Sequence, residues 1–137
     1  MKKLLYIAAL ALLLTPAAGA QEAQKINKKN LVIKEWNTDA KTNKKYLDHT
    51  TTYNPEGKKI EEVEYSYEGQ KWRKRFEYGA DGKVARELTY DEKNRLASIK
   101  KFEYNEFGRK KTQYTYTAKG KLKTIKTFEY VTQDAGN

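Results

Sequence analysis

The chain has 137 residues and no cysteine, with 28 lysines and arginines against 18 aspartates and glutamates, for a formal net charge of +10. This length favours one domain with a modest core, and the lack of cysteine excludes disulfides and thiol chemistry. Leu, Ile, Val and Phe are scarce, as in disordered chains, but the repeat described below predicts a folded protein.

Residues 1–20 have the pattern of a cleaved export signal. A positive start at Lys2 and Lys3 precedes an apolar run over residues 4–14 and small residues at 18–20. The apolar run is much shorter than the roughly 20 residues that span a bilayer, and no cysteine follows it for lipid attachment. We therefore expect a mature chain that begins at Gln21 and is periplasmic or secreted.

Behind the signal the sequence predicts three segments. Residues 21–30 form a polar amino-terminal segment, residues 31–131 a single β-hairpin-repeat domain, and residues 132–137 a polar tail.

One motif recurs six times: Tyr, three residues, Gly or Asn, then Lys, Arg or Gln. The copies begin at Tyr53, Tyr65, Tyr78, Tyr90, Tyr104 and Tyr116. A longer period overlies the motif, because Phe-Glu-Tyr occurs at 76–78, 102–104 and 128–130, each 26 residues after the last. The repeating unit is therefore a pair of strands.

The motif is typical of a three-residue hairpin loop that ends in a left-handed residue, a conformation that Gly or Asn adopts at low cost. The predicted left-handed residues are Gly57, Gly69, Gly82, Asn94, Gly108 and Gly120. With a loop at residues 80–82, the expected cross-strand partners are Tyr78 with Val84, Phe76 with Arg86 and Trp72 with Tyr90. The same offset pairs Tyr90 with Leu96 and Tyr116 with Leu122.

Between the turns the sequence alternates with a period of two, which predicts eight strands. Their expected ranges are 31–37, 45–53, 58–65, 70–78, 83–90, 95–104, 109–116 and 121–131. The expected fold is an all-β, antiparallel up-and-down meander in a strongly curved open sheet or half-barrel, with a closed barrel as the alternative.

Residue parity predicts that the repeat tyrosines share one face of the sheet with Phe76, Phe102 and Phe128. Ile99 and Ile125 have the opposite parity, so either bulges near Ala97 and Thr124 turn them inward or the outer face carries a small apolar patch. No long helical period accompanies the strands. The aromatic face must then be hidden by curling of the sheet or by pairing with another copy.

The segment over residues 90–96 resembles the bacterial YD repeat of Rhs-type secreted proteins, whose units contain Tyr-Asp, two residues and Gly-Arg-Leu. Residues 104–109 and 78–84 are looser copies, and the resemblance covers residues 53–130. It implies antiparallel hairpins in a curved sheet, without catalysis by the repeats. The chain looks similar to small exported bacterial proteins of unknown function that carry degenerate copies of these hairpins.

The excess positive charge lies in the carboxy-terminal half. From Arg95 to Lys126 there are ten basic and two acidic residues, whereas the rest of the mature chain is balanced. Most of the ten have odd numbers, which predicts a common outer face. The candidate polyanion-binding residues are Arg95, Lys101, Arg109, Lys111, Lys121 and Lys123. An acidic polysaccharide, lipopolysaccharide or another polyanion fits such a patch, and the alternative is a set of lysines that prevent edge pairing.

Two aromatic residues, Tyr67 and Phe107, fall in turns and are candidate contacts for sugars or bases. The alternative is ordinary packing, with Phe107 folded back over the sheet edge.

The sequence gives little support for catalysis. His49 is the only histidine, and no serine has spaced partners that would activate it. We therefore expect no enzyme, no cofactor and no metal site. The leading hypothesis is a non-catalytic exported binding or accessory module of the cell envelope. The alternative is an interaction or structural module that forms a homodimer through its aromatic sheet face.

Overall fold

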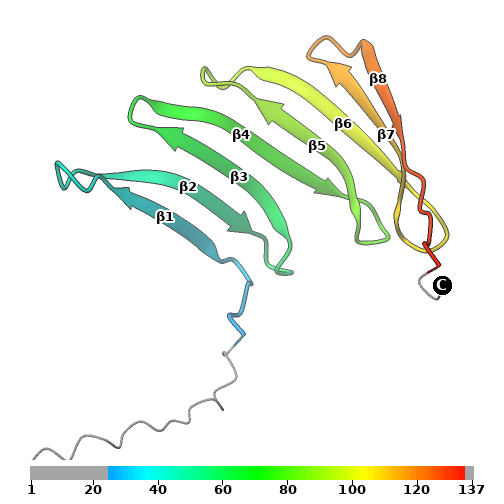
Figure 1. Cartoon of the computed structure of the whole chain (residues 1–137), viewed down its shortest axis with the longest axis horizontal. Coiled ribbons are helices and arrows are strands. Elements are labelled where there is room, and N and C mark those ends of the chain that lie inside the picture. Colours follow the sequence, from blue (N-terminus) through cyan, green and yellow to red (C-terminus); the bar gives the residue numbers. More distant parts are fainter. Residues whose placement is uncertain (1–24, 135–137) are drawn as a thin grey trace, which may run out of the picture.

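The structure, a computed structural model, describes residues 25–134. The predicted export signal over residues 1–20 lies outside this range, as does the end of the predicted tail. Within the range, eight antiparallel strands form one sheet in simple chain order (Figure 1). They are β1 (Val32–Thr38), β2 (Lys45–Tyr53), β3 (Lys59–Ser66), β4 (Gly69–Tyr78), β5 (Val84–Tyr90), β6 (Leu96–Tyr104), β7 (Lys110–Thr117) and β8 (Leu122–Thr127).

The sheet is open. β1 and β8 are its two edges and do not pair with each other, so the closed-barrel alternative is wrong. Residues 25–134 contain no helix. No helical segment among them is long and apolar enough to cross a membrane.

The observed strands lie close to the predicted ones, and the largest difference is at the end of the chain. The sequence predicts a last strand that reaches residue 131, but β8 ends at Thr127. Beyond it, the Phe128 backbone N–H donates a hydrogen bond to the Lys111 carbonyl at 3.1 Å. The chain therefore stays close to the beginning of β7 for one more residue without continuing the strand.

The six predicted left-handed residues all have positive φ, from 63° at Asn94 to 123° at Gly69. In the turn before β6, the Asp91 N–H donates to the Arg95 carbonyl and the Asn94 N–H donates to the Asp91 carbonyl, both at 2.9 Å. These bonds close the expected three-residue loop. The Gly69 turn is tighter, because Ser66 pairs directly with Gly69.

A bulge after each turn shifts the register by one residue. Tyr78 faces Val84 as predicted, but Phe76 faces Glu87 and Arg73 faces Tyr90. The expected pairs of Phe76 with Arg86 and of Trp72 with Tyr90 are therefore wrong. The extra residue in β5 is the physical reason, since two residues of one strand then oppose one of the other. The predicted pairs Tyr90–Leu96 and Tyr116–Leu122 are confirmed.

The same bulges distribute the repeat tyrosines over both faces. Directly opposed residues share a face, and successive residues alternate between faces. Face A carries Phe76, Glu87, Lys100, Phe102 and Gln113, which are connected by cross-strand pairing. Face B carries residues of the other parity in β4 and β6, and the register assigns Tyr90 and Tyr116 to it. The expectation of a single aromatic face is wrong.

Ile99 and Ile125 belong to face B. Ile99 pairs with Leu88 and Tyr116, and Ile125 pairs with Tyr114. Bulges lie in β6 and β8 close to Ala97 and Thr124, but they do not bring these isoleucines to the face of Phe76 and Phe102. The isoleucines lie beside the tyrosines of face B, so the second alternative, an apolar patch on the other face, describes them better. Together they form an apolar group on β5–β8.

The sheet is a single layer, and cross-strand side-chain contacts contribute much of its cohesion. Val63 is the only buried apolar residue of the described chain, with 4% of its surface exposed. Most other strand side chains are half-buried between their neighbours on one face. Stability must therefore come mainly from the backbone ladder and from pairs of side chains on adjacent strands.

Candidate functional site

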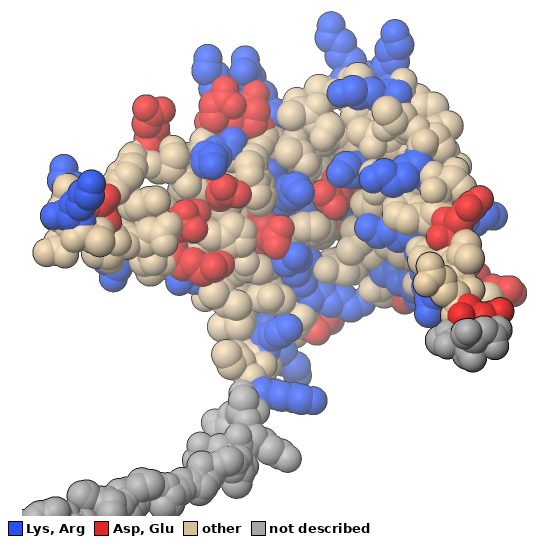
Figure 2. All heavy atoms as spheres, in the orientation of Figure 1, with Lys and Arg blue, Asp and Glu red and all other residues tan. Residues whose placement is uncertain are grey.

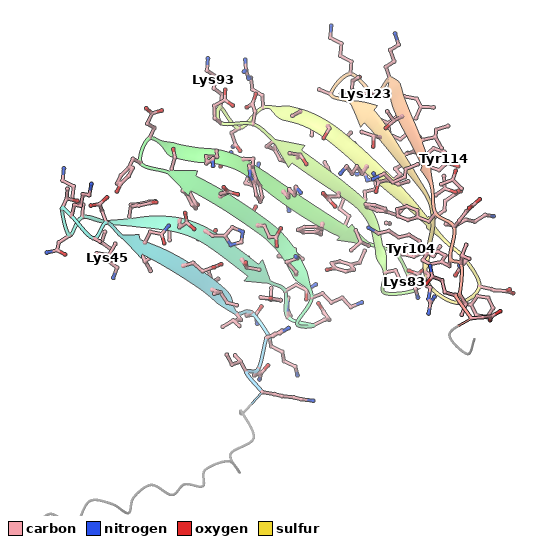
Figure 3. The ribbon with its side chains drawn as sticks, viewed as in Figure 1. Lys45, Lys83, Lys93, Tyr104, Tyr114 and Lys123 are labelled. Atoms are coloured by element: carbon pink, nitrogen blue, oxygen red, sulfur yellow. The ribbon has the colours of Figure 1, made fainter. Side chains whose placement is uncertain are left out.

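The turns alternate between two ends of the sheet. The Gly82 end holds the turns that follow β2, β4 and β6, and the Asn94 end holds those that follow β1, β3, β5 and β7. At the Asn94 end, only basic side chains stand out from the tip of the β7–β8 hairpin (Figure 2). Both Lys93 and Lys123 point away from the sheet there (Figure 3).

The six predicted polyanion-binding residues do not share one face. Arg95 and Lys121 flank turns at the Asn94 end, whereas Arg109 belongs to a turn at the Gly82 end and Lys111 lies at the adjacent start of β7. Lys101 faces Tyr114 on face B, and Lys123 lies at the β8 bulge beside Leu122. The bulges separate residues that parity alone places together.

The excess of basic residues in the carboxy-terminal half is nevertheless reflected in how few of them form ion pairs. Of the ten basic residues from Arg95 to Lys126, only Arg95 forms an ion pair with a described residue, to Asp91 at 3.0 Å. In β3–β5, by contrast, basic side chains pair with carboxylates on their own or an adjacent strand. These pairs are Lys59–Glu62, Lys71–Glu64, Arg73–Glu61, Lys74–Glu87 and Arg86–Glu77.

The tyrosines at the Gly82 end connect successive hairpins on face A. The Tyr78 hydroxyl donates to the Lys59 carbonyl at 2.6 Å, the Tyr104 hydroxyl to Val84 at 2.7 Å, and the Tyr130 hydroxyl to Lys110 at 2.6 Å. Each acceptor lies two residues after the glycine of the preceding turn at this end. We call these three bonds the tyrosine staples.

The basic residue of the motif contacts the same tyrosines. The cationic groups of Lys58, Lys83 and Arg109 lie 5.1, 5.9 and 5.5 Å from the ring centres of Tyr78, Tyr104 and Tyr130. A cation at this distance from an aromatic face is attracted by the ring quadrupole. The spacing Tyr-x3-Gly-Lys/Arg therefore has a structural reason at this end, since the basic residue of one turn covers the tyrosine of the next hairpin.

Burial raises the pKa of both Tyr78 and Tyr104 above the ordinary tyrosine value of 10.0. A hydroxyl that donates a staple bond must keep its proton, so the staples and the raised pKa values agree. For Tyr114 on face B the first cause is its hydrogen bond to Glu103, at 3.0 Å, which raises the pKa of the phenol.

Two hollows lie near the Gly82 end. Tyr78 and Val84 line the smaller one on face A, whereas Gly79 and Lys83, which alternate with them along the strands, line the larger one. One has a volume of about 350 Å³ and is lined by residues of the β4–β5 turn together with Ala85, Phe102 and Tyr104. The other has a volume of about 200 Å³ and extends across β3–β7, where its apolar lining includes Phe76 and Val84. Phe102 and Tyr104 line both hollows and form the wall between them.

Two lysines flank this shared wall. The Lys110 Nζ lies 4.4 Å from the Phe102 ring centre, and the Lys83 Nζ lies 5.9 Å from that of Tyr104. Figure 3 shows Lys83 and Tyr104 beside each other at this end of the sheet. Neither lysine has an ion pair with a described residue, whereas Glu87 in the smaller hollow lies 3.4 Å from Lys74. Aromatic surface and positive charge therefore meet at this end of the sheet, and the Asp81 carboxylate also lines the larger hollow.

Of the two candidate aromatic contacts, Tyr67 lies at the opposite end of the sheet from these hollows, whereas Phe107 lies in the turn between Tyr104 and Lys110 and lines a separate hollow with Arg109 and Tyr130. Tyr67 is 63% exposed, and its ring packs 4.2 Å from that of Tyr46 near the β1 edge. Phe107 is 78% exposed in the turn after β6. That exposure contradicts the alternative in which Phe107 folds back over the sheet.

His49 has a structural environment on face A. Its Nδ1 lies 2.8 Å from Glu35 Oε2, and its ring meets Trp72 edge-on at 6.2 Å between centres. Within residues 25–134 no three His, Cys, Asp or Glu side chains gather where they could hold a metal ion.

Sequence reasoning did not single out Lys83, Phe102, Tyr104 and Lys110 as candidate contact residues. Tyr104 pairs directly with Lys110, at the same offset as Tyr78 and Val84, but the contact of Lys83 with Tyr104 joins two different hairpins. A signal is present in the repeated Phe-Glu-Tyr and Gly-Lys/Arg positions, but on its own it locates turns and not a binding surface.

Comparison with known proteins adds little. No family model matches the chain, and no curated protein matches it. A solved structure described as a GtfA/B complex bound to UDP and GlcNAc is similar over 69% of this chain, with 11% identity and a TM-score of 0.32. The match spans only 19% of that chain.

Proposed function

We propose that this protein is a non-catalytic, exported binding module of the cell envelope that docks on an acidic glycan or another polyanion through its basic carboxy-terminal half. The observation that carries the proposal is the lack of ion pairs among the described residues for nine of the ten basic side chains from Arg95 to Lys126. If these lysines only neutralised nearby carboxylates, they would form ion pairs as the basic residues of β3–β5 do.

The export pattern and the turn motif support the cellular setting of this proposal. A cleaved signal would deliver the chain to the periplasm or the exterior, where acidic polysaccharides and lipopolysaccharide are available partners. The proposal also includes two expectations from the sequence, the resemblance to YD repeats and a strongly curved sheet. Under both expectations the repeats form a scaffold that displays side chains and catalyses no reaction.

The test is retention on an immobilised polyanion. Replacing Lys111 and Lys121 together by glutamate reverses two exposed charges in the basic half, and we expect retention to be lost while the melting temperature is unchanged. Binding of the unmodified protein should also weaken steeply as salt rises from about 50 to about 200 mM, since ionic contacts are screened and counterions are released.

A matched control separates location from net charge. Replacing Lys25 and Lys29 by glutamate makes the same change in net charge at exposed positions before β1, and this variant should remain bound. Equal loss in both variants would indicate attraction to net charge alone. Retention that does not respond to salt would contradict the proposal.

One observation favours the alternative, self-association. Leu122 and Ile125 of face B are 45% and 56% exposed on the β8 edge, so an apolar surface is present although a single aromatic face is not. Sedimentation would detect this function as a tight dimer at micromolar concentration that persists when Lys111 and Lys121 are replaced by glutamate.

A further inference from the structure

The two edges of the sheet are complementary, and we propose that copies of this chain join head to tail, with β8 of one copy pairing antiparallel with β1 of the next. The inference goes beyond polyanion binding and does not depend on it. Unlike a symmetric dimer through a sheet face, this junction uses a different edge of each copy. It is therefore heterologous, and it extends into longer assemblies.

Both edge strands are open to a partner. Within residues 25–134, β1 and β8 each have a neighbouring strand on one side only (Figure 1), and every residue of the two strands is exposed. Such an edge presents unpaired backbone N–H and C=O groups, which are a template for another strand. Because the eight strands alternate in direction, β1 of a second copy lies antiparallel to β8 when both copies keep face A on the same side.

The backbone of β8 restricts which residues can bond across the junction. The Phe128 N–H donates inward to the Lys111 carbonyl of β7, and the direction of the backbone groups alternates along a strand. The N–H and C=O groups of Ile125 and Thr127 therefore point outward, away from β7.

The backbone of β1 has the opposite numbering. The Leu31 carbonyl and the Asp39 N–H both bond inward to the chain of β2 and its flanking residues, so the backbone groups of Lys34 and Trp36 point outward. The junction must then pair odd-numbered residues of β8 with even-numbered residues of β1. The same registers keep face A beside face A, so the backbone and the side chains impose one consistent rule.

One of these registers opposes complementary side chains. Lys126 of face A then faces Glu35, and the apolar Ile125 of face B faces Trp36, as the pairing within the sheet assigns their faces. A shift of two residues in either direction separates both pairs. The complete set of pairs in the proposed register is Thr124–Asn37, Ile125–Trp36, Lys126–Glu35 and Thr127–Lys34.

The 26-residue repeat supports the charge pair of this register. A lysine occupies the same position in three successive repeats, and the first two copies face a glutamate of the preceding strand, in the pairs Lys74–Glu62 and Lys100–Glu87. The third copy, Lys126, faces Gln113 instead. Glu35 of the next copy supplies the missing carboxylate, and its side chain is 57% exposed although it contacts His49.

The isoleucines of face B support the apolar pair. Ile99 lies between apolar side chains of both adjacent strands. Ile125, one repeat later, faces Tyr114 on one side and is 56% exposed. Trp36 is 50% exposed on the opposite edge, and in the junction it gives Ile125 a second aromatic or aliphatic neighbour like those of Ile99.

Charge argues against two copies that join through the same β8 edge. β8 contains Lys123 and Lys126 and no acidic residue, so two β8 edges repel each other, and these lysines protect the edge from like strands. β1 offers Glu35 to them. The bulge at Lys123 limits regular pairing to the last four residues of β8, so the junction is small and the association should be weak.

Proline at an outward N–H blocks one edge at a time. Lys34→Pro removes a donor of β1 and Thr127→Pro a donor of β8, at edge positions where strands tolerate proline. In sedimentation velocity we expect the unmodified protein to form dimers and longer species as its concentration rises from about 10 μM to about 1 mM. Each variant alone should stay monomeric, whereas an equimolar mixture should form dimers that grow no further. Thermal unfolding confirms that both variants fold.

Charge reversal tests the register without proline. Glu35→Lys and Lys126→Glu should each weaken association about tenfold, and a chain with both changes should recover to within about threefold of the unmodified protein. Glu56→Lys is the matched control for Glu35→Lys. It makes the same change in net charge at an exposed position in the turn after β2, outside both edges and outside the basic half, and should associate as the unmodified protein does.

The outcomes separate the possible modes of association. Dimers of Lys34→Pro alone would use two β8 edges, and dimers of Thr127→Pro alone would use two β1 edges, so either result would overturn the head-to-tail junction. Equal growth of both variants would place the contact on a face of the sheet and overturn the edge pairing. An unmodified protein that stays monomeric at about 1 mM would refute the inference and leave polyanion binding, measured by retention, unaffected.

Discussion

Tyr104→Phe isolates the contribution of one tyrosine staple to stability. The change keeps the ring against Lys83 and Phe102 and removes only the hydroxyl, which donates to the Val84 carbonyl at 2.7 Å. This bond is half-buried on face A, so the carbonyl loses its partner in a place where water replaces it incompletely.

The expected cost follows from this geometry. A neutral hydrogen bond contributes about 0.5–1.5 kcal/mol, and a partly desolvated acceptor without a partner moves the cost toward the upper end. We therefore expect a loss of about 1 kcal/mol in the free energy of unfolding, which lowers the melting temperature by about 3–6 °C for a domain of this size. Thermal unfolding followed by circular dichroism at neutral pH measures the shift.

Tyr67→Phe is the matched control for this measurement. Its hydroxyl is in an exposed turn and makes no hydrogen bond with a described residue, so its melting temperature should not change. A Tyr104→Phe protein as stable as the parent would refute the idea that the hydroxyls connect successive hairpins. The repeated tyrosine would then be explained by its ring alone.

Other expectations concern the turns, the titration of the staples and the buried valine. Gly120 has a φ of 86° and open space where a methyl side chain would lie, so Gly120→Ala should cost about 1–2 kcal/mol from backbone strain alone, and Gly120→Asn should melt at a higher temperature than Gly120→Ala. Because the pKa values of Tyr78 and Tyr104 are raised, their stabilisation is fully present below pH 10 and is lost as pH rises through the folded-state values. Tyrosinate absorbance should therefore rise together with unfolding above pH 10, and titration of all tyrosines without loss of structure would contradict the staples. Val63→Ala should cost about 2 kcal/mol by removing two buried methyl-sized groups, whereas Val131→Ala, at a residue 81% exposed, should leave the denaturant midpoint unchanged.

Much of the fold could be predicted because the turns are encoded locally. Positive φ at Gly82 and Asn94 depends on the residue itself and its immediate neighbours, and the alternating pattern between turns fixes the strands. From β2 onward the meander order follows, since two-residue or three-residue loops allow only adjacent antiparallel partners; the connection from β1 to β2, over residues 39–44, is longer.

The face on which each side chain lies could not be predicted from whether its residue number is odd or even, because a bulge adds one residue to a strand and has no distinctive sequence. The extra residue in β5 moves the partner of Phe76 from Arg86 to Glu87. The tyrosines that parity assigns to one surface consequently alternate between two. The residues around Tyr104 were missed for a different reason: Tyr104 and Lys110 pair at the turn as the three-residue loop predicts, but the contact of Lys83 with Tyr104 joins two hairpins and is not encoded locally.

The strictly sequential pairing of the eight strands has a consequence for how such a molecule can change in length. Each hairpin is held by the one before it, through a tyrosine and a basic residue that recur with the 26-residue period. A duplicated 26-residue period would include its own tyrosine and basic residue, and neither adding nor deleting a whole period would require changes to a central hydrophobic core. A gene of this kind can therefore grow or shrink in units of two strands and still encode a folded product.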